Sequence, residues 1–146
     1  MADIHSSIAA RSSRSERPSK RAVAHLVKQA ELHAEDARTM LDVQRFALAA
    51  CASYLALCAA ARTQLAAAGE SSAGDFSDVL ERITLLMGDS YGFAKDLARA
   101  HRAIEQVDDG ELDALSDAHV RPLVDSAERL VDIVRQRTLG GRNGDA

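Results

Sequence analysis

A chain of 146 residues with a net charge of −4 and only 3% aromatic residues has room for one core and little material for a β-sheet. Alanine is abundant, and only eight glycines and two prolines are present to turn or end a helix. This composition suits helices that pack through small side chains, so the sequence predicts a single all-α domain.

Charge is distributed unevenly along the chain. Residues 1–21 carry five basic and two acidic side chains, which leaves a net charge of −7 on the remainder. An acidic body argues against a nucleic-acid-binding surface, because such surfaces are usually basic. Residues 1–18 are rich in Ser and Arg and have little to bury, so we expect a flexible tail there. One helical domain over residues 19–138 and a second tail over residues 139–146 complete the expected organisation.

The segment from Ser19 to Ala68 contains neither glycine nor proline, and Ser19 is a suitable N-cap. Apolar residues keep helical spacing along nearly all of it, which favours one helix of roughly 75 Å. Two helices that separate within the polar run 33–45 are the alternative, and the usual length of helices favours them. Residues 46–61 are uncharged and apolar on all sides, so we expect them to be buried. They span about 24 Å, which is too short for a transmembrane segment.

The N-terminal half of this long helix would carry an apolar stripe that two shorter partner helices cannot cover. We therefore expect another chain, most simply a second copy, to pack on it. The residues of this expected interaction surface are Val23, Val27, Ala30, Ala34, Ala37 and Leu41.

A loop at residues 69–74 precedes a further helix, for which Asp75 or Ser77 is a suitable cap. Apolar residues then repeat with heptad spacing to Val107. The phase continues past two glycines four residues apart, which predicts one helix with a weak point; a break is the alternative. On one helix face, these glycines would let the alanine-rich stretch approach closely. The residues expected in this close packing are Ala47, Cys51, Ser53, Cys58, Gly88 and Gly92.

A last helix is predicted over residues 111–138. Together these segments indicate an antiparallel up-down bundle of three to four long helices, with a long first helix and coiled-coil-like packing. The acidic window Ile104–Asp117 is interpreted as a solvated turn, or as a docking site for a basic partner.

Motifs for catalysis are sparse. The sequence has no histidine pair at i,i+4 and no Gly-rich phosphate loop, so we expect neither a metal nor a cofactor. Cys51 and Cys58 are seven residues apart, which is too far along one helix for a disulfide between them. Two thiols without a secretory signal indicate the cytoplasm.

One short motif resembles a known family. His25 and Lys28 have the His-x-x-Lys spacing of histidine phosphotransfer domains, which are also helical bundles. The resemblance implies phosphorylation of His25, with Lys28 stabilising the phosphoryl group. Gln29 follows the lysine, where that family has a small residue.

Three functions are compatible with these patterns. The first is a non-enzymatic protein–protein interaction module, such as a self-associating adaptor, an assembly factor or a chaperone-like bundle. The second is histidine phosphotransfer through His25 and Lys28. The third is an amphipathic protein that binds a lipid or polymer surface, although such proteins usually carry a basic flanking face.

Overall fold

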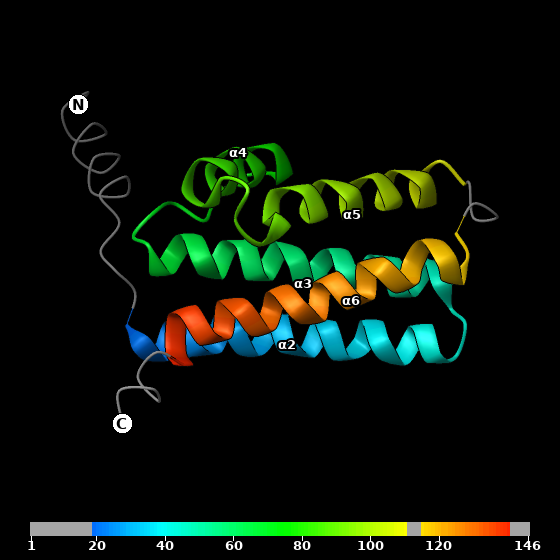
Figure 1. The fold of residues 1–146 in the computed structure, drawn as a ribbon, viewed down its shortest axis with the longest axis horizontal. Coiled ribbons are helices and arrows are strands. Elements are labelled where there is room, and N and C mark those ends of the chain that lie inside the picture. Colours follow the sequence, from blue (N-terminus) through cyan, green and yellow to red (C-terminus); the bar gives the residue numbers. More distant parts are fainter. Residues whose placement is uncertain (1–18, 111–114, 141–146) are drawn as a thin grey trace, which may run out of the picture.

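Figure 1 shows a computed structural model of the chain, which describes residues 19–110 and 115–140. Every regular element within these two ranges is helical, which confirms the all-α prediction. The elements are α2 (Lys20–Asp42), α3 (Phe46–Ala67), α4 (Phe76–Met87), the 3₁₀ turn η1 (Ser90–Gly92), α5 (Phe93–Asp108), α6 (Asp117–Arg135) and the π-helical turn η3 (Gln136–Gly140). The tail expected at residues 1–18 lies outside the described residues, as do residues 141–146 of the second tail.

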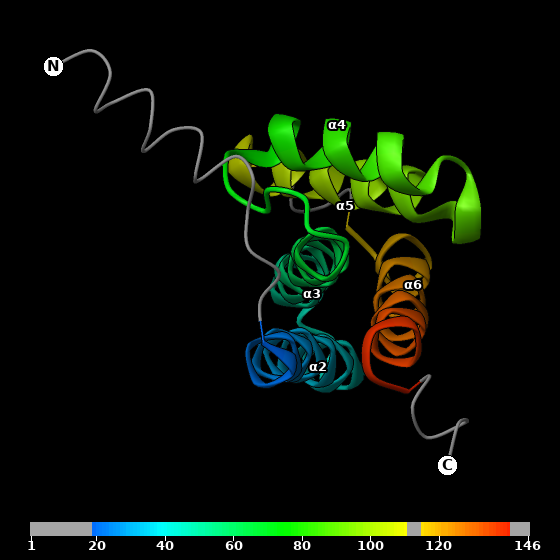
Figure 2. The same cartoon turned by 90° about the vertical axis from the view of Figure 1, so that its left-hand side faces the viewer.

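The helices are arranged around α3. In Figure 1, α2, α3 and α6 run along the long axis of the molecule, with α2 antiparallel to both others. Figure 2 shows these three helices end-on and α4 lying across them on the far side of α3 from α2. The described residues thus form five helices, of which the longest has 23 residues. The predicted bundle of three to four long helices with a long first helix is not confirmed.

Alanine explains the central place of α3. This helix packs against α2, α4, α5 and α6, and helices approach closely where the side chains between them are small. Its alanines on the covered sides are fully buried, and Leu57 and Leu65 on the same helix also have no exposed surface. The prediction that this stretch is buried holds for most of its residues. The fully buried alanines are Ala49, Ala50, Ala56, Ala60 and Ala61.

The first long helix was predicted wrongly, because the chain turns back at residues 43–45. Val43 ends α2, Gln44 adopts a left-handed conformation with φ of 62°, and α3 begins at Phe46. The Gln44 amide donates to the Leu41 carbonyl at 2.9 Å, and the Arg45 amide donates to the Met40 carbonyl at 2.8 Å. This pair of bonds is the Schellman motif, in which a left-handed residue closes a helix. The alternative break within residues 33–45 is therefore the correct one.

The second long helix also breaks, at its glycines. α4 ends at Met87, and Gly88 and Gly92 have φ of 56° and 66°. A methyl group added at Gly88 would meet no atom within 4 Å, so this glycine is needed for its conformation and not for close packing. The predicted contact of the two glycines with the alanine-rich stretch is wrong. Tyr91 between them also has a positive φ, and Arg129 of α6 donates to its carbonyl at 3.0 Å.

Two predicted helix starts are confirmed. The Ser19 hydroxyl accepts a hydrogen bond from the Ala22 amide at 3.1 Å. Asp75 and Asp78 form a reciprocal capping box at the start of α4. Such caps satisfy amide groups that have no partner within the helix. The last helix begins at Asp117, and residues 111–114 of the predicted element lie outside the described ranges.

Candidate functional site

The stripe expected to receive another chain is buried within this one. α3 and α6 both pack against α2, and none of the six stripe residues keeps more than 6% of its surface exposed. The prediction of an exposed interaction surface is corrected, because the turn at residues 43–45 brings α3 over the stripe. The residues concerned are Val23, Val27, Ala30, Ala34, Ala37 and Leu41.

A different apolar surface stays open, on α3. Leu48 and Leu55 are 50% and 47% exposed although they belong to the central helix. They are seven residues apart, and Cys51 between them is partly buried. Residues at this spacing share one face of a helix. We call Leu48, Cys51 and Leu55 the α3 seam. Figure 2 shows α3 with α2, α6 and the α4–α5 pair around it, and no described helix on its remaining side.

The α3 residues predicted to pack closely fall into two groups. Ser53 is fully buried, whereas Ala47, Cys51 and Cys58 are partly buried. The Ser53 hydroxyl oxygen has no hydrogen-bond partner within the described part of the chain. Leaving a buried hydroxyl unpaired costs about 1–3 kcal/mol, so Ser53 is a local weakness of the core.

Aromatic rings join α3, α4 and α5. The rings of Phe76 and His101 are stacked, with centroids 3.9 Å apart and planes inclined by 8°. Tyr54 lies 5.9 Å from both rings. Burial raises the pKa of the Tyr54 hydroxyl, which hydrogen-bonds with Cys58, and burial also raises the pKa of that thiol. A thiol whose pKa is raised is a poor nucleophile, so this cluster is suited to packing and not to thiolate chemistry.

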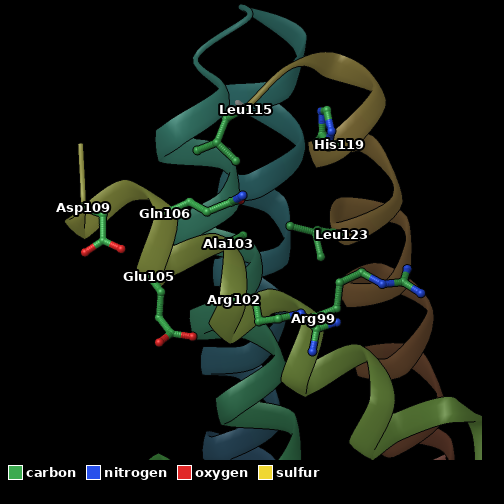
Figure 3. Close-up of a pocket in the computed structure, with 9 residues that line it drawn as sticks. All are labelled: Arg99, Arg102, Ala103, Glu105, Gln106, Asp109, Leu115, His119 and Leu123. Carbon is green, nitrogen blue, oxygen red and sulfur yellow. The ribbon is translucent and has the colours of Figure 1, made fainter. Parts of the chain in front are cut away.

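A groove of about 440 Å³ lies between α5 and α6 (Figure 3). It forms because both helices pack on α3 and diverge from each other toward the end of α5. Figure 3 shows the side chains of α5 on one wall and His119 and Leu123 of α6 on the other. The lining residues are Arg99, Arg102, Ala103, Glu105, Gln106, Asp109, Leu115, His119 and Leu123.

The cationic wall of the groove is only partly neutralised. Arg99 lies 3.9 Å from Asp96, but this carboxylate accepts a 2.8 Å hydrogen bond from Arg129. Asp96 is itself 7% exposed, so a partner for its charge is required. Arg129 is the closer partner of Asp96, so Asp96 neutralises the charge of Arg99 only in part. Arg102 makes no ion pair or hydrogen bond with any described residue.

The phosphotransfer candidates lie on the outer surface of α2. His25 and Lys28 are both exposed, within the first three turns of the helix, and make no ion pair or hydrogen bond to described residues. Their i,i+3 spacing brings both side chains to the same side of α2.

No group of three or more His, Cys, Asp and Glu side chains in residues 19–110 and 115–140 is placed to hold a metal ion. The acidic residues between α2 and α6 serve as ion-pair partners instead. Arg38 donates to Asp125 at 2.7 Å and to Glu128 at 2.5 Å, and these two carboxylates raise the pKa of the guanidinium. This network joins the first and last described α-helices.

Comparisons with known proteins do not identify a relative: no family model, no curated protein and no solved structure matches the chain significantly. α3 extends past the apolar stretch 46–61 to Ala67, and with 22 residues it is the one helix in the described part that is long and apolar enough to cross a membrane. Half of the relevant window is buried by other helices, and the core helix of a soluble protein meets the same criterion.

Sequence reasoning missed both the α3 seam and the α5–α6 groove. The seam residues were taken as part of one continuous buried stripe, since spacing alone does not reveal which helix faces are covered. The groove has a weak signal in the spacing of Arg99, Arg102 and Gln106, which share one face of α5. Its second wall depends on the position of α6, which the sequence of α5 does not contain.

Proposed function

We propose that this protein is a non-enzymatic protein–protein interaction module that associates with a second copy of itself through the α3 seam. The observation that carries the proposal is the exposure of Leu48 and Leu55 on the most apolar of the described helices. Their spacing with Cys51 is three and four residues, which is the a/d spacing of coiled-coil interfaces. The buried small residues elsewhere on α3 pack against the other described helices, so the face that carries the seam is left for a partner.

The expected association is weak. Burying a leucine side chain completely contributes about 1.5–3 kcal/mol, so the exposed halves of two leucines on each of two chains contribute about 4 kcal/mol. The loss of translational and rotational freedom opposes association by a similar or larger amount. Neighbouring side chains must therefore add contact area, and we expect a dimer that dissociates on dilution.

Sedimentation equilibrium over a range of protein concentrations tests the proposal. The wild-type chain should show a mass that rises with concentration toward twice that of one chain. Leu55→Glu should abolish the rise, because a dimer would bury the new charge. The matched control is Leu85→Glu on α4, where the leucine is 80% exposed and lies outside the seam. A wild-type mass that stays monomeric at every concentration excludes self-association.

Phosphotransfer at His25 is the second candidate function. It is favoured by the exposure of His25 beside Lys28 on one side of α2, where a phosphodonor can approach. Incubation with acetyl phosphate should then give an acid-labile phosphate that His25→Gln removes and His33→Gln keeps. Absence of such a phosphate excludes this function.

Binding to a lipid or polymer surface is the remaining alternative, and it would use the same seam. Co-sedimentation with liposomes distinguishes it from self-association. A chain that pellets with liposomes through Leu55, but stays monomeric without them, would support surface binding over self-association.

A further inference from the structure

The groove between α5 and α6 combines an apolar floor with cationic side chains. We propose that it binds a small amphipathic anion, in which a carboxylate or phosphate group is carried on a short aliphatic chain. This site is separate from the α3 seam and does not depend on self-association.

The size and floor of the groove suit the aliphatic part of such a ligand. Its volume of about 440 Å³ lies within the range of about 300–1,000 Å³ that is typical of small-molecule sites. Ala103 of α5, Leu115 just before α6 and Leu123 of α6 line it, and each keeps at most 6% of its surface exposed. A short chain lying on these three side chains would be removed from water on one side.

The arginines suit the anionic head group. Arg99 and Arg102 are three residues apart on α5, and Figure 3 shows both side chains on the side of α5 that faces α6. Like charges at this spacing repel each other. Since Asp96 is held by Arg129, no described carboxylate neutralises the pair fully. An anion between the two guanidinium groups would remove this repulsion, and their planar donor geometry matches carboxylate and phosphate oxygens.

His119 of α6 lies on the opposite wall, at the other end of the groove from the two arginines (Figure 3). The Ser116 hydroxyl oxygen lies 2.8 Å from its Nδ1. His119 therefore borders the part of the groove that would receive the tail of the ligand and not the part that would receive the head group.

Two carboxylates also line the groove but do not neutralise this cationic part. Glu105 lies 3.4 Å from Nδ1 of His101, and in Figure 3 it points away from the arginines. Asp109 follows the last residue of α5, at the far end of the groove. Their charges disfavour a second anionic group on the ligand. A single head group with an uncharged tail is therefore the chemistry that fits.

Titration of the chain labelled with ¹⁵N and ¹³C, followed by NMR of arginine side chains and leucine methyl groups, tests this inference. Octanoate and octyl phosphate are the probes, and octyltrimethylammonium is the probe with the opposite charge. We expect saturable shifts of the Arg102 side-chain Nε–Hε and Leu123 methyl signals with the two anions at low millimolar concentration. The anion that binds more tightly identifies the preferred head group, and no saturable shift is expected with the cation.

Two variants test whether the anion binds in the groove or is attracted to any cationic side chain on the surface. Arg102→Gln should weaken anion binding about tenfold, since a hydrogen bond to a charged group is lost. Lys28→Gln removes the same charge from the surface of α2 and should leave binding unchanged. Both positions are exposed, so both variants are expected to fold. Equal binding by the wild type and Arg102→Gln, or no saturation by either anion, overturns the inference.

Discussion

Replacing Gln44 with glycine tests the turn that separates α2 from α3. Gln44 holds the left-handed position of the Schellman motif, and glycine is the residue most often found there. The same motif ends α3, where the Gly69 amide donates to the Ala66 carbonyl at 3.0 Å and the Glu70 amide donates to the Leu65 carbonyl at 2.9 Å. The chain therefore uses glycine at one of two equivalent positions and glutamine at the other.

The expected change in stability on replacing Gln44 follows from the backbone conformation of this residue. A side chain in the left-handed region costs about 1–2 kcal/mol, and the greater freedom of glycine in the unfolded chain costs about 0.5–1 kcal/mol. Gln44→Gly should therefore stabilise the protein by about 0.5–1 kcal/mol. Gln29→Gly is the control, because Gln29 is exposed in the interior of α2 and its replacement should cost about 1 kcal/mol.

Urea denaturation followed by circular dichroism measures both changes. With a slope of about 1–3 kcal/mol per molar urea, the two variants should shift the midpoint in opposite directions by a few tenths molar or more. If Gln44→Gly destabilises the chain as much as Gln29→Gly does, then residue 44 lies within a continuous helix. That result would refute the turn and the burial of α2 that depends on it.

Three further variants and conditions address the core. Leu57→Ala should destabilise the chain by about 3–5 kcal/mol in urea denaturation, because Leu57 is fully buried, whereas Leu85→Ala on the surface should change stability by less than about 0.5 kcal/mol. Ser53→Ala should be neutral or stabilising by up to about 1 kcal/mol in the same assay, since it removes an unpaired buried hydroxyl. Burial raises the folded-state pKa of Cys58 above 9.0 and that of Tyr54 above 10.0. Their neutral forms therefore contribute to the stability of the folded state below pH 9.0, and this stability is lost as the pH rises through their folded-state pKa values. If the denaturation midpoint of the wild-type chain does not fall more than that of Tyr54→Phe between pH 8 and pH 11, this direction of the pH dependence is contradicted.

The sequence predicts the helical content and the apolar stripe of α2, because both depend on local residue type and spacing, but it does not show that this chain itself covers the stripe. It does not reveal the turn at residues 43–45. Leu41 and Leu48 are seven residues apart, so the apolar pattern stays in phase across the turn although the chain reverses direction. Apolar spacing indicates which residues share one face of a helix and carries no information on the direction of the chain.

At residues 88–92 the heptad pattern favours a continuous helix for the same reason, and the alternative, a break at the two glycines, is the correct one. Both Gly88 and Gly92 have positive φ, which the heptad pattern around them conceals. The candidate sites depend even more on tertiary structure. Leu48 and Leu55 are exposed because no described helix covers that side of α3, and the α5–α6 groove exists because two helices diverge.

Oxidative cross-linking of the seam tests the central proposal most directly. In a chain whose Cys58 is replaced by alanine, Cys51 is left as one native thiol in the seam, between the intact Leu48 and Leu55. A chain with one thiol cannot form a disulfide within itself. In the control, both native cysteines are replaced by alanine and Leu85→Cys places the thiol at an exposed position outside the seam.

Copper phenanthroline followed by non-reducing electrophoresis should give a covalent dimer of the seam variant and much less of the control. Cys51 lies between the two leucines of the seam, so two seams packed in either orientation bring the two thiols together. Equal dimer yields from seam and control variants, or none from the seam, would contradict self-association through α3.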